Sequence, residues 1–432
     1  MTTAAPATDH SRDPEPINMR AEDFAARPLE VIERIRAAGG SAPVVFLDGQ
    51  PARAFVDDAD VRTILSDRRF VVDPENVPQG LETTRRSDAM VALGLRRDLV
   101  TYLTESLLDK DGSDHARLRK LVSRTFTVRR VNEMRASVER ISADLLAALP
   151  DHADEDGVVD LIEHFAYPLP ITVICDLVGV PVADRARWHA WSHQLAQFDP
   201  ARPEVMNEAL GAMIDHVEAM ITERREHPRG DLLDALVRAR DEDGGRLSQS
   251  ELVTLVFTLV IAGHETTAHL LGNGTRALLE HPDQLALLRS DPGLLPTAVH
   301  EMLRVGGTAV SAKARYATEE VRLERGVVPA GQRAVALISG ANHDPEVHSE
   351  PHRFDVTRQQ GRPGEAHVAF GHGAHYCLGA ALARQEGEVA FGSLLTTYPE
   401  LSLVPGRPPV SDAVPGTLRL RELPIRLRPA EV

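Results

Sequence analysis

The segment from Leu252 to Leu271 constrains the fold more than any other part of the sequence. It is apolar on all sides, and a helix that is hydrophobic all round must be buried. Its most apolar part, Leu252 to Ala262, is far shorter than the roughly 18 uncharged residues that indicate a membrane span. The sequence therefore predicts a helix through the middle of a large core and no membrane association.

The rest of the chain offers no obvious place to divide this core. Its 432 residues contain no Gly/Ser-rich linker, low-complexity tract or fixed-period repeat, so we expect one large domain over residues 21–432. Residues 1–20 are expected to form a flexible tail. They lack the basic start and apolar stretch of a signal peptide.

Charge and cysteine content limit the functional classes. A net charge of −16 argues against affinity for nucleic acid or anionic membranes, because both require a basic surface. Two cysteines, Cys175 and Cys377, form no disulfide framework, which is typical of a reducing cytoplasm. We therefore expect a cytoplasmic protein, and a monomer.

Hydrophobic periodicity predicts a mainly α protein with small β-sheets. Short strands are expected over 43–47 and 53–56, and again between residues 312 and 337. The chain from 342 to 369 is rich in Pro, His and Asp and is expected to be irregular. Further long helices are expected over 131–149, 205–225 and 378–396.

The run Phe370-Gly-His-Gly-Ala-His-Tyr-Cys-Leu-Gly379 carries a reactive residue type in an unusual setting. A zinc site is one interpretation, but structural zinc sites bring two pairs of ligands and no second pair is visible. A cysteine hydrolase stays open, because sequence alone does not place its base. The glycines predict a backbone that passes close to a flat, bulky group. A helix that starts after Cys377 is expected to lower the pKa of its thiol.

Polar residues interrupt the apolar helix at Ala262-Gly-His-Glu-Thr-Thr267. An interior Gly costs a helix about 1 kcal/mol relative to Ala, and the Thr266 hydroxyl can bond back to the Ala262 carbonyl. Both features predict a widened groove, although a core helix with one capped polar face is also consistent. His264 and His269 are five apart, so they do not form the i, i+4 pair of a zinc protease.

Both segments resemble signatures of the cytochrome P450 family, in its soluble bacterial type. The cysteine run is similar to Phe-x-x-Gly-x-(His/Arg)-x-Cys-x-Gly at every fixed position, and the helix segment to Ala/Gly-Gly-x-Asp/Glu-Thr. The resemblance covers nearly the whole chain after the tail and implies the P450 fold, a single domain shaped like a triangular prism. It implies haem b as the cofactor, Cys377 as its axial ligand, and Glu265 and Thr266 as an acid–alcohol pair that relays protons to dioxygen. It also places Phe370, Gly371 and His375 against the haem, with His375 at a propionate.

Two weaker patterns gain meaning from this resemblance. The pair Glu301 and Arg304 lies at i, i+3, which on a solvated helix is common and worth only about 0.2 to 0.5 kcal/mol. By resemblance to the family's Glu-x-x-Arg pair it has a structural role. The basic stretch 114–126 fits an ordinary solvated helix, but the resemblance implies that its His115 and Arg119 bind haem propionates together with Arg315. The remaining basic residues are expected to dock an acidic ferredoxin: Arg117, Lys120, Arg124, Arg129 and Arg130.

The implied activity is a monooxygenase that uses O2 to hydroxylate or epoxidise a hydrophobic small molecule. A polyketide, macrolide or terpenoid secondary metabolite is the expected substrate, and a fatty acid or xenobiotic is the alternative. A non-catalytic P450-like partner of a glycosyltransferase is a further alternative, but such partners typically lack the ligand cysteine. Because no dinucleotide-binding or iron–sulfur motif is visible, electrons are expected from NAD(P)H through ferredoxin reductase and ferredoxin.

Substrate contacts are predicted from the same resemblance. Gly306 and Gly307 stand where many relatives carry aromatic and Pro residues, so they are expected to enlarge or loosen the pocket. The predicted substrate-facing residues are Leu93, Leu95, Leu259, Gly263, Val310 and Leu418.

Overall fold

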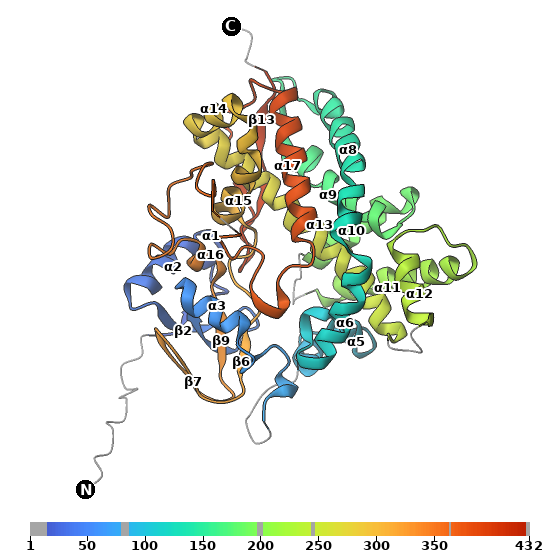
Figure 1. The fold of residues 1–432 in the computed structure, drawn as a ribbon, viewed down its shortest axis with the longest axis vertical. Helices are drawn as coiled ribbons and strands as arrows, with labels where there is room; N and C mark the ends of the chain where they lie inside the picture. The colour runs from blue at the N-terminus through green and yellow to red at the C-terminus, as the bar shows by residue number, and fades with distance from the viewer. Residues whose placement is uncertain (1–14, 79–85, 197–201, 243–246, 363, 429–432) are drawn as a thin grey trace.

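Helices dominate the protein and pack around one long central helix, α13 (Gln249–Glu280) (Figure 1). The computed structural model describes residues 15–78, 86–196, 202–242, 247–362 and 364–428. Ser248 caps α13 in a capping box with Glu251, which satisfies free N–H groups at the helix start. By length and composition α13 could cross a membrane, but most of its apolar window is buried inside the protein, as predicted for a core helix.

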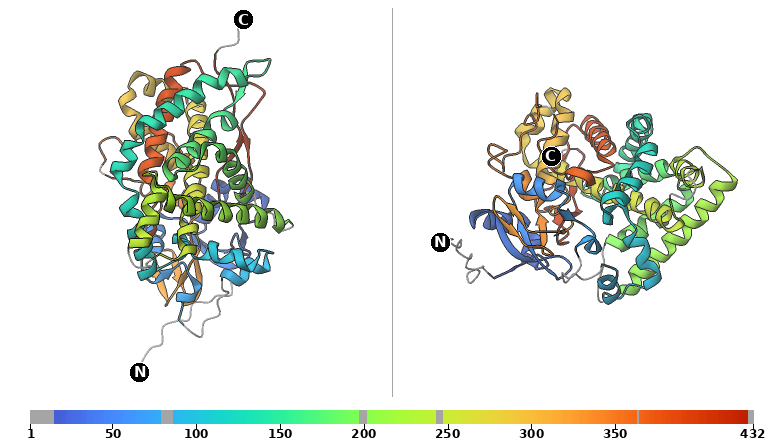
Figure 2. Two further views of the ribbon diagram at one scale, coloured as in Figure 1. Left: turned by 90° about the vertical axis from the view of Figure 1, so that its right-hand side faces the viewer. Right: turned by 60° about the horizontal axis from the view of Figure 1, so that its bottom comes forward.

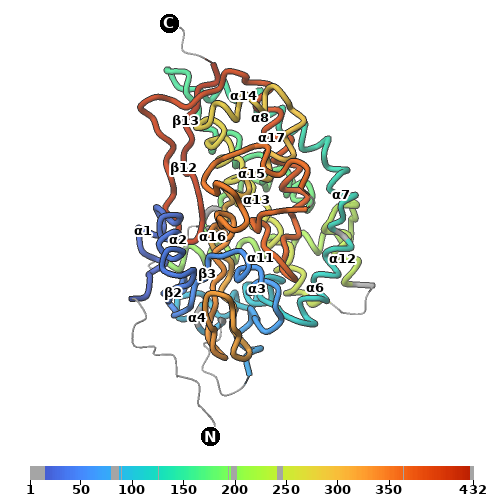
Figure 3. The backbone as a smooth tube through the Cα atoms, turned by 60° about the vertical axis from the view of Figure 1, so that its left-hand side comes forward, coloured from blue at the N-terminus to red at the C-terminus, as the bar shows by residue number. Residues whose placement is uncertain are grey.

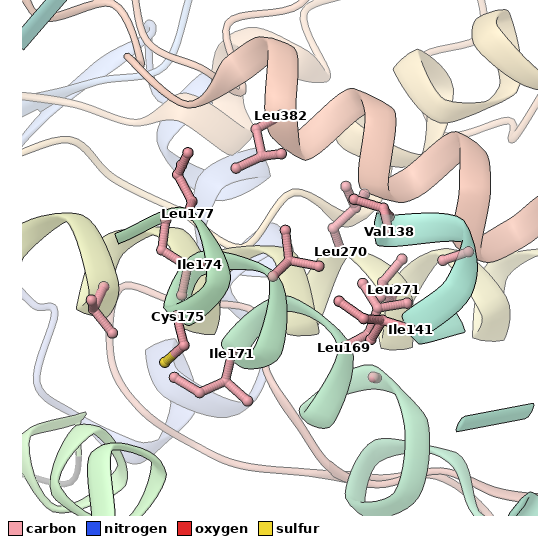
Figure 4. Packing of buried hydrophobic residues seen from close by; sticks show 14 of the residues in the cluster. Val138, Ile141, Leu169, Ile171, Ile174, Cys175, Leu177, Leu270, Leu271 and Leu382 are labelled. Atoms are coloured by element: carbon pink, nitrogen blue, oxygen red, sulfur yellow. The ribbon is translucent and has the colours of Figure 1, made fainter. Parts of the chain in front are cut away.

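The helices that pack directly on α13 form the main hydrophobic core. Figure 4 shows leucine, isoleucine and valine side chains from α8, α9, α13 and α17 meeting in one layer, with Ile174 and Leu270 among them. The main neighbours of α13 are α5 (Arg97–Thr104), α9 (Pro168–Val178), α11 (Pro203–Glu226), α15 (Leu295–Gly306) and α17 (Ala380–Thr397). The other helices of this region are α4 (Arg86–Ala92), α6 (Gly112–Thr125), α7 (Val128–Glu133), α8 (Arg135–Ala148), α10 (Arg185–Ala196), α12 (Leu232–Glu242) and α14 (Pro282–Ser290).

A six-stranded sheet lies beside the helices, as the right-hand view of Figure 2 shows. Its strand order is β1 (Ile17–Asn18), β2 (Ser41–Val45), β3 (Pro51–Phe55), β9 (Arg333–Ala336), β6 (Arg315–Ala317) and β4 (Phe70–Val71). Strands from both β-rich regions expected from the sequence therefore join in this sheet, where β3 pairs with β9 in parallel. The sequence did not predict the short strand β4 at its edge.

Both faces of this sheet are buried. Along β3, Ala54 packs into one cluster with residues of α2 (Pro28–Ala37), whereas Phe55 packs into another with residues of α3 (Asp58–Ser66). This alternation is the two-residue period of a strand. The short helices α1 (Glu22–Ala26) and α16 (Ile338–Asn342) lie in the same region (Figure 3).

The remaining strands are short. A three-stranded sheet has the order β10 (Ser402–Leu403), β13 (Pro424–Arg426) and β5 (Val158–Asp160). Two hairpins pair β7 (Val321–Leu323) with β8 (Gly326–Val328), and β11 (Val410–Ser411) with β12 (Leu420–Glu422). Figure 3 shows β12 running down the side of the molecule toward α2.

The predicted tail boundary is wrong. Residues 1–14 of the expected tail lie outside the described part of the chain. Residues 17 and 18, however, form β1 in parallel with β2, and Met19 is only 1% exposed in the cluster beneath α2. The ordered domain therefore starts before residue 21, because the chain must pair with β2 before α1 begins.

Candidate functional site

Cys377 lies in a tightly turned loop just before α17. Its N–H donates to the Phe370 carbonyl at 2.8 Å, and Gly371 and Gly373 have φ angles of +74° and +72°, which L side chains rarely adopt. A Cβ atom at Gly373 would lie 2.6 Å from the Leu65 carbonyl oxygen of α3. Gly373 thus lets the loop pack on α3.

Burial dominates the electrostatics of the Cys377 sulfur. Burial raises the pKa of the Cys377 thiol, and the Gly379 N–H and the Arg119 guanidinium oppose this effect without reversing it. The start of α17 thus lowers this pKa as expected, but in the polypeptide by itself burial has the larger effect. A bound metal ion would be needed to hold the sulfur as a thiolate, since coordination deprotonates a thiol.

Cationic and imidazole groups gather near this loop. The rings of His115 and His375 lie 4.2 Å apart between centroids. Burial, followed by the charges of Arg315, His115, Lys313 and Arg119, lowers the pKa of His375 to about 3. Arg119 and Arg315 also have lowered pKa values because they are buried.

Two of these groups have hydrogen-bonding nitrogens without a partner in the described part of the chain. Within the residues that the structure describes, His115 Nε2 and Arg315 Nε are buried without a hydrogen-bond partner. No carboxylate in the same described ranges lies within 4.0 Å of the Arg119 or Arg315 guanidinium, and Asp111 only reaches 4.0 Å from His375 Nε2. Buried donors without acceptors are costly, so this cluster fits a ligand that brings its own carboxylates.

One face of α13 is open although the helix is otherwise buried. Ala262 and Thr266, one turn apart, are both exposed, whereas their neighbours His264, Glu265 and Thr267 are buried. The Thr266 hydroxyl donates to the Ala262 carbonyl at 2.7 Å, as predicted. The helix remains α-helical through this segment, so the expected widening is not a change of helix type.

Glu265 points to a different side of the helix from Thr266 and is held there. Its Oε2 accepts a hydrogen bond from Arg419 Nη2 at 2.8 Å. Arg419 Nε also donates to His269 Nε2 at 3.1 Å, and the Tyr167 hydroxyl lies 3.2 Å from the same nitrogen. Burial by itself would raise the pKa of Glu265, but the nearby His269 imidazole and the Arg419 charge bring it below its usual value. Glu265 is therefore a carboxylate at neutral pH.

Arg419, Tyr167 and His269 were not predicted from the sequence. Arg419 is 154 residues from Glu265 along the chain and sits in no recognisable motif. The only available signal was that a buried carboxylate requires a partner.

The Glu301 and Arg304 pair is fully buried rather than solvated. Arg304 donates to both Glu301 carboxylate oxygens at 2.8 Å. It also donates to the carbonyls of Asn342, Pro351 and Arg353 at 2.7 to 3.1 Å. The pair therefore ties α15 to the irregular segment that follows α16.

Comparison with known proteins decides the family. A sequence model described as Cytochrome P450 matches residues 81–427. The chain belongs to the cytochrome P450 family. It is 40% identical over 416 residues to the cytochrome P450 monooxygenase PikC of Streptomyces venezuelae, covering 94% of this chain and 92% of that protein. It is 39% identical over 386 residues to the 6-deoxyerythronolide B hydroxylase of Saccharopolyspora erythraea, covering 89% and 92%.

A solved structure shows the same relationship. The tirandamycin C-bound P450 monooxygenase TamI superimposes with a TM-score of 0.81 at 39% identity, covering 96% of this chain and all of that one. The mainly helical P450 fold expected from the sequence is thus confirmed, and the chain is a P450 monooxygenase, an oxidoreductase that uses O2 and a hydrophobic substrate. P450s hold a haem, and the unpaired donors around His115 and Arg315 fit its two propionates.

The predicted substrate contacts divide into two groups. Leu259 and Leu418 are partly buried beside the core clusters, and Leu93 is 40% exposed. Leu95 and Val310 are buried, Val310 completely, and all of these leucine and valine contacts remain predictions.

The glycines predicted near the substrate lie against neighbouring segments of the fold. The side of Gly263 on which a side chain would project faces Ile174 of α9, with 3.1 Å between that Cβ position and Ile174 Cδ1. Gly306 and Gly307 pack against Asn273 and the Leu303 carbonyl, so they allow close packing rather than a wider pocket. Ala262, which the sequence reasoning missed, lies on the open face; its position one turn before Thr266 was the available signal.

Proposed function

We propose that this P450 hydroxylates a polyketide or macrolide secondary metabolite. The observation that carries the proposal is the open face of α13, where the small Ala262 and Thr266 are both exposed one turn apart. The relatives support it, since two are named for 6-deoxyerythronolide B and for binding tirandamycin C. One oxygen atom of O2 enters the substrate and the other leaves as water, which consumes two electrons and two protons.

We propose that Cys377 is the axial ligand of the haem and that Phe370 and Gly371 lie beside it. His115, Arg119, Arg315 and His375 would hold the propionates, which would explain why His115 Nε2 and Arg315 Nε have no partner within the described residues. When bound, the haem supplies the reductive activation of dioxygen.

We propose that Thr266 and Glu265 deliver the protons that the reaction consumes. Because the Thr266 hydroxyl gives its hydrogen to the Ala262 carbonyl, its lone pairs are left to accept a hydrogen bond from water on the open side. Thr266 therefore orders a water molecule as the immediate proton source. Glu265 is the group nearby in sequence that can replenish this proton.

Ferredoxin is the proposed electron donor, with its reductase and NAD(P)H behind it. Lys120, Arg124 and Arg129 are exposed on α6 and α7, which supports docking of an acidic protein. Arg117 is less suitable than expected, because it forms an ion pair with Glu251 at the start of α13. Arg130 is half-buried and donates to the Gly230 carbonyl at 3.0 Å.

We also propose that the described chain from residue 15 to residue 428 is one domain and that it works as a cytoplasmic monomer. The contacts of α3 with the loop at 373–375, and of α15 with α16, support a continuous packing between sheet and helices.

A carbon monoxide difference spectrum of the reduced protein tests the function. A thiolate-ligated haem gives the red-shifted Soret band, and Cys377→Ala should abolish that band. Cys175→Ala is the matched control, because Cys175 is buried in the main core and should leave the band unchanged. A wild-type protein without the band would instead support a non-catalytic role.

A panel of compounds read by spin-state change tests the substrate class. The panel holds 6-deoxyerythronolide B, tirandamycin C and myristic acid. Tighter binding of a macrolide or polyketide supports the proposal, whereas preference for myristic acid would make the protein a fatty-acid hydroxylase.

A further inference from the structure

A charged network connects the Cys377 loop (370–379) with α17. Glu365, a few residues before the loop, forms an ion pair with Arg384 of α17. The hydroxyl of Tyr376, the residue directly before Cys377, donates to the other Glu365 carboxylate oxygen at 2.9 Å. Arg384 Nη1 also lies 3.5 Å from the Tyr376 hydroxyl oxygen. One carboxylate therefore binds both a cation on α17 and the residue next to the sulfur.

An aromatic contact brings the same cation close to the loop backbone. The Arg384 guanidinium lies over the Phe370 ring, with 5.5 Å between its Cζ atom and the ring centroid, which is within the range of a cation–π interaction. The Phe370 carbonyl accepts the Cys377 N–H at 2.8 Å, and the Phe370 and Tyr376 rings are 6.3 Å apart between centroids. Glu365 and Arg384 thus each contact a residue that is bonded or hydrogen-bonded to Cys377.

Both charged side chains are partly shielded from solvent. The Glu365 side chain is 19% exposed and that of Arg384 is 29% exposed, and partly buried charges are screened less than charges on an open surface. Arg119, Glu365 and Arg384 all act electrostatically on the Cys377 sulfur. In the function proposed above, a haem propionate compensates the charge of Arg119. The fields of Glu365 and Arg384 remain, because neither has a haem group as its partner.

A fixed charge beside the sulfur changes how readily the iron is reduced. Reduction moves one electron from the ferredoxin, which is oxidised, to the haem iron, and it adds one negative charge to the iron–thiolate group. A neighbouring cation stabilises this added charge, whereas a neighbouring anion opposes it. Groups around the ligands of a metal centre set its potential in this way. Arg384 therefore favours reduction and Glu365 disfavours it.

We propose, on the basis of the monooxygenase function above, that Glu365 and Arg384 are positioning residues that together set the reduction potential of the haem on Cys377. Tyr376 holds the Glu365 carboxylate against the loop, and Arg384 offsets its charge. The paired network thereby keeps the iron reducible by the ferredoxin. An unpaired Glu365 opposes the first electron, and an unpaired Arg384 favours it.

Reduction potentials of haem-loaded variants test this proposal without a substrate. They are measured by spectroelectrochemical titration. Arg384→Gln should lower the potential and Glu365→Gln should raise it. Each change should alter the equilibrium constant for reduction about ten-fold, the effect of a unit charge about 10 Å away at an effective dielectric constant of about 20, which corresponds to about 59 mV for one electron. The double variant should return close to the wild-type potential, because the two missing charges are opposite.

Conservative variants and a remote ion pair separate the effect of charge from damage to the loop. Arg384→Lys keeps the cation, so its equilibrium constant should stay within about two-fold of the wild-type value. Tyr376→Phe keeps both charges but releases Glu365 from the loop, so it should raise the potential by less than Glu365→Gln does. Arg407→Gln and Asp154→Asn are the matched controls: they remove the same charges from an exposed pair between the turn after β10 and the segment before β5. Both should change the constant by less than two-fold.

Two results would overturn the proposal. One is a shift of the same sign in Arg384→Gln and Glu365→Gln, which would indicate a disturbed loop instead of a charge effect. The other is a shift in Glu365→Gln that is no larger than in Arg407→Gln, which decides the matter even if Arg384→Gln does not retain haem. Absence of the carbon monoxide band in the wild-type protein would instead refute the proposed function, so the two failures are distinguishable.

Discussion

Replacing Arg304 with Met should destabilise the protein far more than a matched change in a surface ion pair. Arg304 makes five hydrogen bonds, two to the Glu301 carboxylate and three to carbonyls of the 342–353 segment. Arg304→Met removes all of them and leaves the Glu301 carboxylate, which is 0% exposed, without its main cation. Loss of one partner from a buried pair costs about 3 to 5 kcal/mol. Arg358 Nε still lies 3.0 Å from Glu301, so we expect the lower end of this range.

The assay is thermal unfolding by far-UV circular dichroism at equal haem content. An unfolding entropy of about 2.1 cal/mol/K per residue converts this loss to a fall in Tm of about 3 to 6 °C for a chain of this length. Arg276→Met is the control, because Arg276 and Glu280 also lie 2.8 Å apart but are 40% and 39% exposed. Exposed pairs contribute about 0 to 1 kcal/mol, so the control should shift Tm by about 1 °C or less. Equal shifts in the two variants would refute the view that burial sets the contribution of the pair.

Three other changes test separate parts of the site. Thr266→Ala should leave haem binding intact but divert electrons from product to hydrogen peroxide; unchanged coupling would contradict the proton role of Thr266. Gly373→Ala should reduce haem content and stability, because the new Cβ would lie 2.6 Å from the Leu65 carbonyl oxygen. Gly406→Ala is the control: Gly406 also has a positive φ, but nothing lies within 4 Å of its Cβ position, so backbone strain alone should cost about 1 kcal/mol of stability. Equal losses of stability in the two variants would show that backbone strain, and not the contact with Leu65, sets the effect. His348 is 0% exposed, and its pKa is lowered to about 3 by burial and then by nearby arginines, so its contribution to stability is present above about pH 6.5 and declines as the pH falls toward 3. His348→Leu should therefore reduce the loss of stability between pH 7 and pH 5, measured by urea unfolding, by about 2 kcal/mol, and an unchanged loss would exclude His348 as its source.

The parts of the fold that were predicted correctly depend on local patterns. The helix around Leu252 to Leu271 was predicted because an all-apolar helix has one physical solution, burial. The helix at 380–397 and the strands at 41–45 and 51–55 followed from periodicity in the same way. Boundaries were less accurate, and β1 was missed because two residues carry no period.

The sheet was predicted in pieces, because pairing between distant strands leaves no local trace. Arg53 of β3 pairs with Ala334 of β9, and neither short strand indicates the other. Each strand was predicted by itself, without its partner strand or the helix that covers it.

Thr266 and Glu265 show which contacts of the site depend on the local sequence and which depend on the tertiary fold. The hydrogen bond from Thr266 to Ala262 was predictable, because residues four apart in a helix are always neighbours. The partner of Glu265 was not, because Arg419 comes from a hairpin that folds back over 154 residues.

The sequence by itself determined the chemistry of this protein: a cysteine in a glycine-rich loop, an acid and an alcohol in a buried helix, and cations spaced along a second helix. These are short segments in which backbone geometry follows from neighbouring residues. The tertiary structure decided how those groups are used. Within the described residues it left His115 Nε2 and Arg315 Nε without acceptors, and it set Gly373 against α3. It turned Glu265 to Arg419, because a buried charge takes its partner from whichever distant segment the packing brings beside it.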